Sequence, residues 1–338
     1  MCANRDTEDS ILKSAFQHYP FLEIEESEDF KIYRVNDTAG IGSGTLRCFR
    51  VMPGVHLSYD CLDMKSCYQR MSPVHGFLEI SHCKEGCFEF ELDDGQVCFL
   101  GEGDLCVCLH ENCYFKSSHL PREHYRGISL VIDIQLAQKT IEHMFPTAEI
   151  DLIELERRFQ QKGVYMIRAR AELEHIFSEL YHVDERIRKT YSLIKTVELI
   201  LFLSLTLEEP QERLPRFLPS TVSQTKQVHQ FVSEHPCCKN TCKELAESFY
   251  ISETSLRTCF KAIYGYPLAT YQKIQLMNHA AQLMQTQQEC SLSEISEMCG
   301  YNNQSKFSAA FKAIQGKTPR CYRRILFDGL EQNHDTPE

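Results

Sequence analysis

The chain has 338 residues, a length that predicts two or three domains with room for sizeable hydrophobic cores. It is 43% hydrophobic and 25% charged, with 20 Phe and 15 Tyr, which excludes a disordered or collagen-like chain. The most apolar run, residues 191–207, contains Lys195 and Glu198 and is short for a membrane span. The N-terminal residues lack the basic cluster and apolar stretch of a secretory signal, so we expect a cytoplasmic protein with no membrane association.

Charge is distributed unevenly along the chain. Residues 221–327 carry 12 Lys and Arg against seven Glu, a net charge of +5, whereas the remainder carries 24 basic and 40 acidic residues. This distribution is expected if only the C-terminal segment meets a polyanion.

Residues 31–133 show short β-type segments punctuated by glycine. Phe88, Phe90 and Leu92 alternate with glutamates, and Asp94-Gly95 predicts a hairpin turn before a returning strand at 97–100. We expect residues 101–104 to turn into a strand at 105–109, and residues 127–133 to form a closing strand. Together these segments predict a small antiparallel barrel or sandwich over residues 1–135.

From about residue 136 the apolar spacing becomes helical. The members of the two stripes are Leu173, Ile176, Phe177, Leu180 and then Ile187, Tyr191, Ile194, Val197, Leu201, Leu205. Helices in a segment spanning 136–207 would bury these stripes against each other or against a second subunit, and we expect a homodimer through residues 171–207. The alternative is that the stripe packs on the barrel. Three prolines without periodicity then predict a linker at 208–220.

Beyond the linker the sequence nearly repeats itself at an offset of about 51 residues. Leu256, Phe260, Lys261, Ile263 and Gly265 reappear as Phe307, Phe311, Lys312, Ile314 and Gly316. Each copy predicts a short helix, a tight turn at 250–251 or 300–301, and a second helix capped by Ser or Asn. This is a helix-turn-helix arrangement, whose second helix enters the major groove of DNA.

A helix of about residues 268–285 is expected between the two copies. At 1.5 Å per residue it would be roughly 27 Å long. A rod of that length holds two recognition helices near the ~34 Å separation of successive major grooves. One chain would then contact two adjacent groove segments.

Residues 221–327 resemble the DNA-binding domain of the AraC/XylS family of bacterial transcription regulators. The resemblance rests on residues in the family's order and spacing: Leu245, Ala246, Ser252, Leu256, Phe260, Lys261, Gly265, Pro267, Tyr271, Ala280, Ile295, Gly300, Tyr301, Phe307, Phe311, Lys312, Gly316, Thr318, Pro319, Tyr322 and Arg323. It implies an α+β protein: an N-terminal cupin-like antiparallel β-barrel with a helical dimerisation segment, then an all-α DNA-binding domain with two helix-turn-helix units. Residues 328–338 would form a tail.

Two positions depart from the family pattern. Leu276 stands where the family usually has Arg, and Ser296 stands where Ala is common. The first departure removes a phosphate contact or an internal salt bridge that the family pattern would supply. Neither departure is expected to change the fold.

Family correspondence also assigns the residues that contact DNA. The groove-facing residues are Thr254, Arg257 and Thr258 on the first recognition helix and Gln304, Ser305 and Ser308 on the second. By geometry Arg suits guanine and Gln suits adenine. The residues assigned to phosphate are Lys261, Lys306, Lys312 and Arg323. Phe260 and Phe311 are expected in the core, and RNA polymerase is considered as a further partner.

Seventeen Cys in a long chain without a secretory signal predict reduced thiols that act mainly as small core residues. The closest approaches to a zinc-binding spacing are Cys83/Cys87, Cys106/Cys108 and Cys238/Cys242, none with the two-residue gap of a zinc ribbon. His75 followed by Glu79 is the nearest fragment of a cupin metal motif. We therefore expect no metal, no cofactor and no catalytic site.

The sequence thus predicts a transcription regulator rather than an enzyme, switched by a small molecule in its N-terminal domain. Residues 75–104 are similar to the branch of the family that regulates iron-siderophore uptake. That likeness, with a barrel lined by Phe, Tyr and Cys, predicts an apolar cavity suited to an aromatic chelate. Three alternatives remain: a filled barrel that is only a scaffold, a thiol-based redox sensor, and an enzyme such as a thiol methyl acceptor with an appended DNA-binding module.

Overall fold

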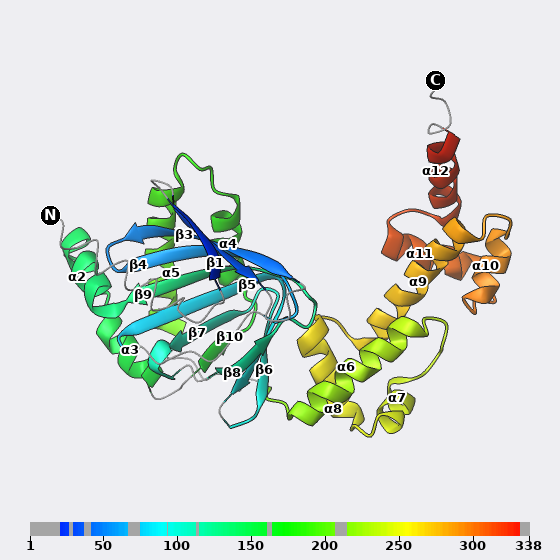
Figure 1. The fold of residues 1–338 in the computed structure, drawn as a ribbon, viewed down its shortest axis with the longest axis horizontal. Coiled ribbons are helices and arrows are strands. Elements are labelled where there is room, and N and C mark those ends of the chain that lie inside the picture. The colour runs from blue at the N-terminus through cyan, green and yellow to red at the C-terminus, as the bar shows by residue number, and fades with distance from the viewer. Residues whose placement is uncertain are drawn as a thin grey trace. The chain divides into compact units, whose positions relative to one another are not determined.

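The structure, a computed structural model, describes residues 21–26, 30–36, 42–66, 75–92, 94–112, 115–160, 164–206 and 215–331. The chain divides into two compact units, with the main division between Pro219 and Ser220. The N-terminal unit combines an antiparallel sheet with helices, and the C-terminal unit is helical (Figure 1). The predicted α+β fold class is therefore confirmed.

Within the described residues, ten strands form the sheet of the N-terminal unit. They are β1 (Phe21–Glu26), β2 (Lys31–Asn36), β3 (Ser43–Met52), β4 (Val55–Asp63), β5 (Phe77–Leu92), β6 (Val97–Gly101), β7 (Leu105–Leu109), β8 (Phe115–His119), β9 (Tyr125–Asp133) and β10 (Val164–Ile167). The order is β1-β2-β3-β4-β9-β5-β7-β10, with β6 and β8 both paired to β5. Every ladder is antiparallel, and β1 precedes the segment from which strands were predicted.

The long strand β5 joins the two halves of this sheet. Its first half pairs with β9 and β7, and its second half pairs with β6 and β8. The predicted hairpin is confirmed, since Phe88 lies opposite Leu100 and Phe90 opposite Cys98. Gly95 takes a φ of +75°, a value that favours glycine. The predicted strand at 105–109 and the closing strand are also present, as β7 and β9.

After β9, the described residues of the N-terminal unit form four α-helices: α2 (Ile134–Met144), α3 (Leu152–Gln160), α4 (Ala171–His182) and α5 (Arg188–Thr206). A short 3-10 helix, η1 (His110–Asn112), follows β7. The expectation of purely helical structure after residue 136 was wrong at β10, which pairs with β7. Its four residues are too few to show a strand period, so the pairing is visible only in the tertiary structure.

The sheet carries a hydrophobic core on each face. One core packs strand residues such as Leu57 and Leu130 against helix residues such as Phe159, Phe177 and Leu203. The second core lies on the opposite face of the strands and has no helix residue in it; its members include Leu46, Phe90 and Tyr125. Alternation along each strand assigns neighbouring residues to different cores.

The two predicted helical stripes have different environments. Leu173, Ile176, Phe177 and Leu180 on α4 are all buried, as expected. On α5 the buried apolar residues are instead Leu199, Ile200 and Leu203. Ile187, Ile194, Leu201 and Leu205 are exposed, and Leu205 retains 71% of its accessible surface. The second stripe is therefore not buried within one chain.

The part of the C-terminal unit that the structure describes contains seven helices: α6 (Pro219–Glu234), α7 (Cys242–Ser248), α8 (Glu253–Tyr264), α9 (Leu268–Thr286), α10 (Leu292–Met298), α11 (Gln304–Gln315) and α12 (Pro319–Glu331). Helix α6 starts inside the segment expected as a linker, because proline is tolerated in the first turn of a helix. Phe217, two residues before α6, forms an antiparallel β-bridge with Val97 of β6. Helix α12 likewise continues into the expected tail and ends at Glu331. Residues 207–214 and 332–338 lie outside the described part of the chain.

Candidate functional site

The C-terminal unit contains two helix-turn-helix motifs built to the same plan. In the first, α7 and α8 are joined by residues 249–252, and in the second, α10 and α11 are joined by residues 299–303. The first helix of each motif begins with a capping box, Thr241 with Glu244 and Ser291 with Glu294. Asn303 caps α11, as predicted from its position. The predicted double helix-turn-helix architecture is confirmed.

The turns of the two motifs also correspond at the level of backbone hydrogen bonds. Ile251 N donates to Ala246 O at 3.0 Å, and fifty residues later Tyr301 N donates to Ser296 O at 2.9 Å. The residue before each donor has positive φ, +55° at Tyr250 and +71° at Gly300. Because a β-carbon disfavours this conformation, the tyrosine in the first turn is held there by the surrounding helices.

Helix α9 connects the motifs and contributes to the core of the unit. Tyr271, Met277, Ala281 and Met284 are buried as predicted, whereas Ile274 is only half-buried. Phe260 and Phe311 are fully buried, which confirms their assignment to the core. The second motif packs on α9 through a cluster that includes Phe307 and Ile295. These contacts leave the opposite faces of α8 and α11 to solvent.

The residues predicted to contact DNA lie mainly on those solvent faces. Thr254, Arg257, Thr258 and Lys261 are exposed on α8. On α11 the exposed members are Gln304, Ser305, Lys306 and Lys312, and Ser308 is half-buried. Each recognition helix therefore presents hydrogen-bonding and cationic side chains together on one surface, the combination that base and phosphate contacts require.

Comparison with known proteins bears on the same segment. Residues 245–325 match the family model of a helix-turn-helix domain. The chain is 26% identical over 147 residues to the probable transcriptional regulator LumQ of Photobacterium leiognathi, covering 43% of this chain and 55% of LumQ. It is 37% identical over 76 residues to the F1 operon positive regulatory protein of Yersinia pestis, covering 22% of this chain and 25% of that protein. The chain thus spans about half the length of the first relative.

The C-terminal unit therefore contains an AraC-type helix-turn-helix domain, and over this segment the chain is similar to regulators of the AraC/XylS family. The family residues from Leu245 to Arg323 and the matched helix-turn-helix model occupy the same segment. A crystal structure of ToxT from Vibrio cholerae is 12% identical, covers 81% of this chain and 98% of its own, and has a TM-score of 0.31. The matches in sequence therefore place the AraC-type domain in the C-terminal unit.

Glu253 is a residue of the AraC-type domain that sequence reasoning did not single out. Its carboxylate accepts hydrogen bonds from Arg257 Nε at 3.0 Å and from the guanidinium Nη2 at 2.5 Å. The two residues are four apart on α8, a spacing that brings side chains together and was visible in the sequence. The ion pair holds the guanidinium beside the helix. To contact DNA, Arg257 must either keep its ion pair with Glu253 while also binding the DNA, or break that ion pair.

Arg323 has an internal partner as well. Its guanidinium donates to the main-chain carbonyl of Gln288, in the turn between α9 and α10. This contact ties α12 to that turn, a structural role beside the phosphate contact expected from the family. Leu276 packs against the core of the second motif, so the family's usual Arg is replaced by an apolar contact. Ser296 is buried, and its hydroxyl has no hydrogen-bond partner within the described residues.

The N-terminal unit contains a cavity of about 70 Å³ within its second core. Its apolar lining includes Leu46, Leu62, Phe88, Phe90, Leu100 and Tyr125. Five polar residues also line it: Asp60, Glu79, Ser81, Ser118 and Ser129. The expected cavity lined by Phe, Tyr and Cys is present, with Cys106 and Cys108 also in its lining, but it contains more polar groups than expected. Ser58, Asp60 and Leu62 alternate along β4, which places the carboxyl group on the inner face of the sheet.

The two carboxyl groups are connected through serine hydroxyls. Ser129 Oγ donates to Asp60 at 2.6 Å, Ser81 Oγ donates to Glu79 at 3.2 Å, and the two hydroxyl oxygens are 3.2 Å apart. Burial raises the pKa of Asp60 to about 7, despite the opposing effect of its hydroxyl donors. Burial also acts on Glu79, but the hydrogen bond and charge of His110, at 2.9 Å, outweigh it and lower the pKa of that carboxyl.

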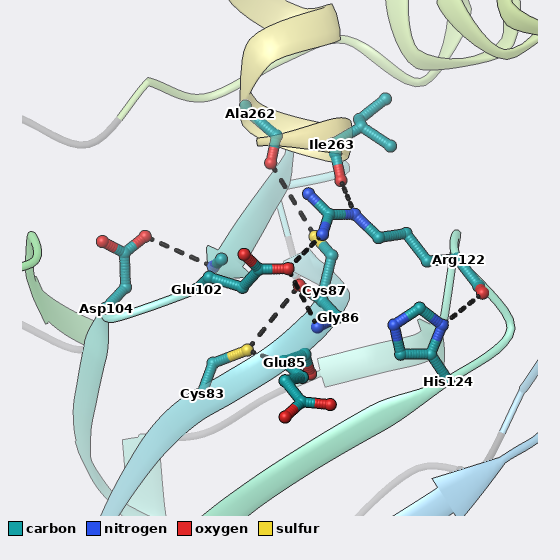
Figure 2. A network of polar contacts seen from close by, with 11 residues as sticks. Cys83, Glu85, Gly86, Cys87, Glu102, Asp104, Arg122, His124, Ala262 and Ile263 are labelled. Atoms are coloured by element: carbon teal, nitrogen blue, oxygen red, sulfur yellow. Dashed lines mark hydrogen bonds and ion pairs between the residues drawn. The ribbon is translucent and has the colours of Figure 1, made fainter. Parts of the chain in front are cut away.

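Of the thiols considered as zinc ligands, Cys83, Cys87 and Cys106 are buried, whereas Cys238 is exposed. Cys83 donates to the carbonyls of Glu85 and Gly86 at 3.6 and 3.7 Å (Figure 2). Glu102 accepts from Gly86 N at 3.3 Å and from Arg122, which closes the same loop (Figure 2). Burial raises the pKa of Cys83 well above its usual value, so this thiol stays protonated. Among the cysteines that the structure describes, Cys108 departs from the expected reduced state, since it is in a disulfide.

The histidines are distributed among separate partners. His75 contacts Glu111 at 2.5 Å, while Glu79 contacts His110, so the predicted His75 and Glu79 fragment does not come together. Within the described ranges, no three His, Cys, Asp or Glu side chains lie close enough together to hold a metal ion. None of the helices in these ranges is both long and apolar enough to cross a membrane.

Proposed function

We propose that this protein is a sequence-specific DNA-binding transcription regulator. Its α8 and α11 would enter successive major-groove segments of one duplex, with Arg257 and Gln304 as the principal base-contacting residues. The observation that carries the proposal is the pair of equivalent helix-turn-helix motifs, each with its polar face exposed and its phenylalanine face buried on one scaffold. A regulator of this kind acts in the cytoplasm, with RNA polymerase as its functional partner, and carries out no catalysis of its own.

The remaining cationic residues would position the duplex. Lys261 lies on α8, and Lys306 and Lys312 lie on α11; all three are exposed. Phosphate contacts of this type supply affinity and register without base preference. Thr258 donates its hydroxyl proton to Thr254 O at 2.9 Å, so its oxygen remains an acceptor toward a base or a bridging water.

The effector would bind in the cavity of the N-terminal unit. Asp60 and Glu79 favour a ligand that brings hydrogen-bond donors or positive charge, because a half-buried carboxyl group gains from such partners. A ferric catecholate or phenolate chelate, the ligand class implied by the siderophore-regulator likeness, carries negative charge and is less well matched to this lining. The cavity volume of about 70 Å³ admits a few water molecules, so a larger effector requires the lining side chains to move.

Self-association would use the exposed face of α5. Ile194 and Leu205 retain 56% and 71% of their accessible surface, Leu201 lies on the same helix, and Ile187 immediately precedes it. Apolar residues repeated along one helix face are costly to leave in water and are covered in many symmetric dimers. A homodimer would present four helix-turn-helix motifs to a repeated DNA site.

The thiol-sensor alternative receives less support from the structure. The buried thiols of Cys48, Cys83, Cys98 and Cys106 have pKa values raised mainly by burial. Oxidation proceeds from the thiolate, which such groups do not form readily.

Footprinting of the full-length protein on the DNA upstream of its own gene would locate a specific site. On that site we expect Arg257→Ala or Gln304→Ala to weaken binding by ~1 to 3 kcal/mol and to relax preference at one base pair. Lys306→Ala would instead weaken binding to specific and random DNA alike. Equal losses on both kinds of DNA for all three variants would contradict the assignment of base-contacting residues.

A further inference from the structure

A groove of about 420 Å³ lies on the N-terminal unit and shares no lining residue with the inner cavity. Its floor comes from Arg47 and Phe49 on β3 and Tyr59 on β4, which face the side of the sheet that helices cover. Its wall is the turn between α4 and α5 together with the first residues of α5. The groove therefore joins the sheet to the helix that carries the exposed apolar face.

Positive charge is concentrated in this groove. Arg47, Arg186, Arg188 and Lys189 line it, and the acidic residue that lines it is Glu185. The chain outside residues 221–327 has 40 acidic against 24 basic residues, so this surface has the opposite sign to most of its unit. Arg188 and Lys189 are also the first two residues of α5, whose N-terminus adds partial positive charge.

Two of these arginines converge on one oxygen atom. Arg47 Nη1 and Nη2 each lie 3.4 Å from Glu185 Oε1, and Arg188 Nη1 donates to the same oxygen at 3.0 Å. The Glu185 side chain is 69% exposed to solvent. Its ion pairs with the two arginines are therefore weak. Arg188 Nε is buried and makes no hydrogen bond to any described residue. The groove thus has one oxyanion position, filled by the protein's own carboxylate, and one spare donor.

Aromatic rings lie next to that position. Phe49 and Tyr59 are stacked with centroids 6.1 Å apart and planes at 22°. The Arg47 guanidinium lies 4.1 Å from the ring centroid of Phe30, and the Arg188 guanidinium 5.7 Å from that of Tyr59. Flat apolar surfaces beside paired guanidinium groups suit a planar ring that carries a negative group.

We propose that this groove binds a small aromatic oxyanion, with its carboxylate or phosphate on Arg47 and Arg188 in the position of Glu185 and its ring against Phe49 and Tyr59. The site is separate from the DNA interface and from the proposed effector cavity. Its occupancy would clamp the turn before α5 onto β3 and β4.

Calorimetric titration of the full-length protein with benzoate and with AMP tests the site. Each probe is paired with a neutral counterpart, benzamide or adenosine, that keeps the ring and lacks the charge. We expect saturable binding of at least one anion, with its neutral counterpart at least about tenfold weaker, since a charge-assisted pair of hydrogen bonds is lost. Binding of benzoate alone assigns a carboxylate ligand, and binding of AMP alone assigns a phosphate ester.

Three variants locate the site. Arg47→Gln and Arg188→Gln are each expected to weaken binding by about tenfold. Arg34→Gln is the matched control, because Arg34 forms an ion pair with Glu25 at the same distance of 3.4 Å and does not line the groove. Glu185→Gln is expected to tighten binding several-fold, because it removes the competing carboxylate.

Glu185→Gln keeps the test decisive if an arginine variant fails to fold, because unfolding cannot produce a gain in affinity. The proposal is overturned if neither anion binds saturably, or if anion and neutral counterpart bind equally. It is also overturned if Arg34→Gln weakens binding as much as Arg47→Gln, or if Glu185→Gln leaves the affinity unchanged or lowers it.

Discussion

The same backbone position carries different side chains in the two helix-turn-helix motifs. Ala246 and Ser296 each accept a main-chain hydrogen bond from the residue five positions on, and both are buried. Ala246 has no polar side chain to satisfy, whereas the Ser296 hydroxyl lacks a partner within the described residues. A buried hydroxyl without a partner keeps its desolvation cost.

We therefore expect Ser296→Ala to raise the free energy of unfolding of the AraC-type domain by about 1 kcal/mol. Ala246→Ser, the mirror change in the first motif, is expected to lower it by a similar amount. Urea unfolding followed by far-ultraviolet circular dichroism measures both. A loss of stability in Ser296→Ala would show that the hydroxyl has a partner, such as an ordered water.

Asp60 makes the stability of the N-terminal unit dependent on pH. Burial raises its pKa from 3.8 to about 7 in the folded protein. Between these values the folded state binds more protons than the unfolded state, so stability is fully present below about pH 4 and falls as the pH rises through 7. A shift of this size corresponds to at most about 4 kcal/mol.

Asp60→Asn is expected to remove this decline and to be more stable than the wild type at pH 8. Thermal unfolding at pH 5 and pH 8 measures the difference. Glu79→Gln provides the control, because the pKa of Glu79 is lowered and its replacement brings no gain at pH 8. If Asp60→Asn loses stability equally at both pH values, the carboxyl group is ionised in the folded protein throughout this range.

At the scale of the element, α5 has two faces with different partners. Leu199, Ile200 and Leu203 pack into the core shared with the sheet, while Ile194, Leu201 and Leu205 point to solvent. Lys195 is buried between these faces, with its ammonium group 2.9 Å from Glu198 and paired also with Glu179. This local ion pairing orients α5 on α4 and leaves the outer apolar face available to a second chain.

We expect the wild type to sediment as a dimer at micromolar concentration and Ile194→Asp or Leu205→Asp to sediment as a monomer with unchanged circular dichroism. Burying a charge in an apolar interface is the reason. Ile153→Asp is the control, since Ile153 is a comparably exposed apolar residue on α3. A wild-type monomer, or a dimer that persists in both α5 variants, would contradict this interface.

At the scale of the whole molecule, a net charge of −11 is combined with a C-terminal segment of net charge +5. Long-range repulsion from the acidic remainder is screened within about 8 Å at physiological ionic strength. We therefore expect DNA affinity to depend on the local cations of α8 and α11 rather than on the total charge.

The logarithm of the affinity of the intact protein is expected to fall linearly with the logarithm of salt concentration. Lys306→Gln and Lys312→Gln would each reduce the slope by about 0.9, the value for one lost phosphate contact. Lys139→Gln, at an exposed site on α2, is expected to leave it unchanged. Fluorescence anisotropy of labelled duplex at several salt concentrations measures the slopes, and an equal change in all three variants would exclude these phosphate contacts.

The sequence by itself determined the double helix-turn-helix motif, the polar faces of its recognition helices and the hairpin at Asp94-Gly95. These features depend on residues close together in the chain, where helical period, caps and turn residues act directly. Tertiary structure alone decided that Asp60 and Glu79 share one cavity, that β10 joins β7, and that the α5 stripe faces outward. Each of these results depends on contacts between segments distant in sequence. Alternation along a strand shows which residues share a face of the sheet, but it does not show which other segment packs on that face.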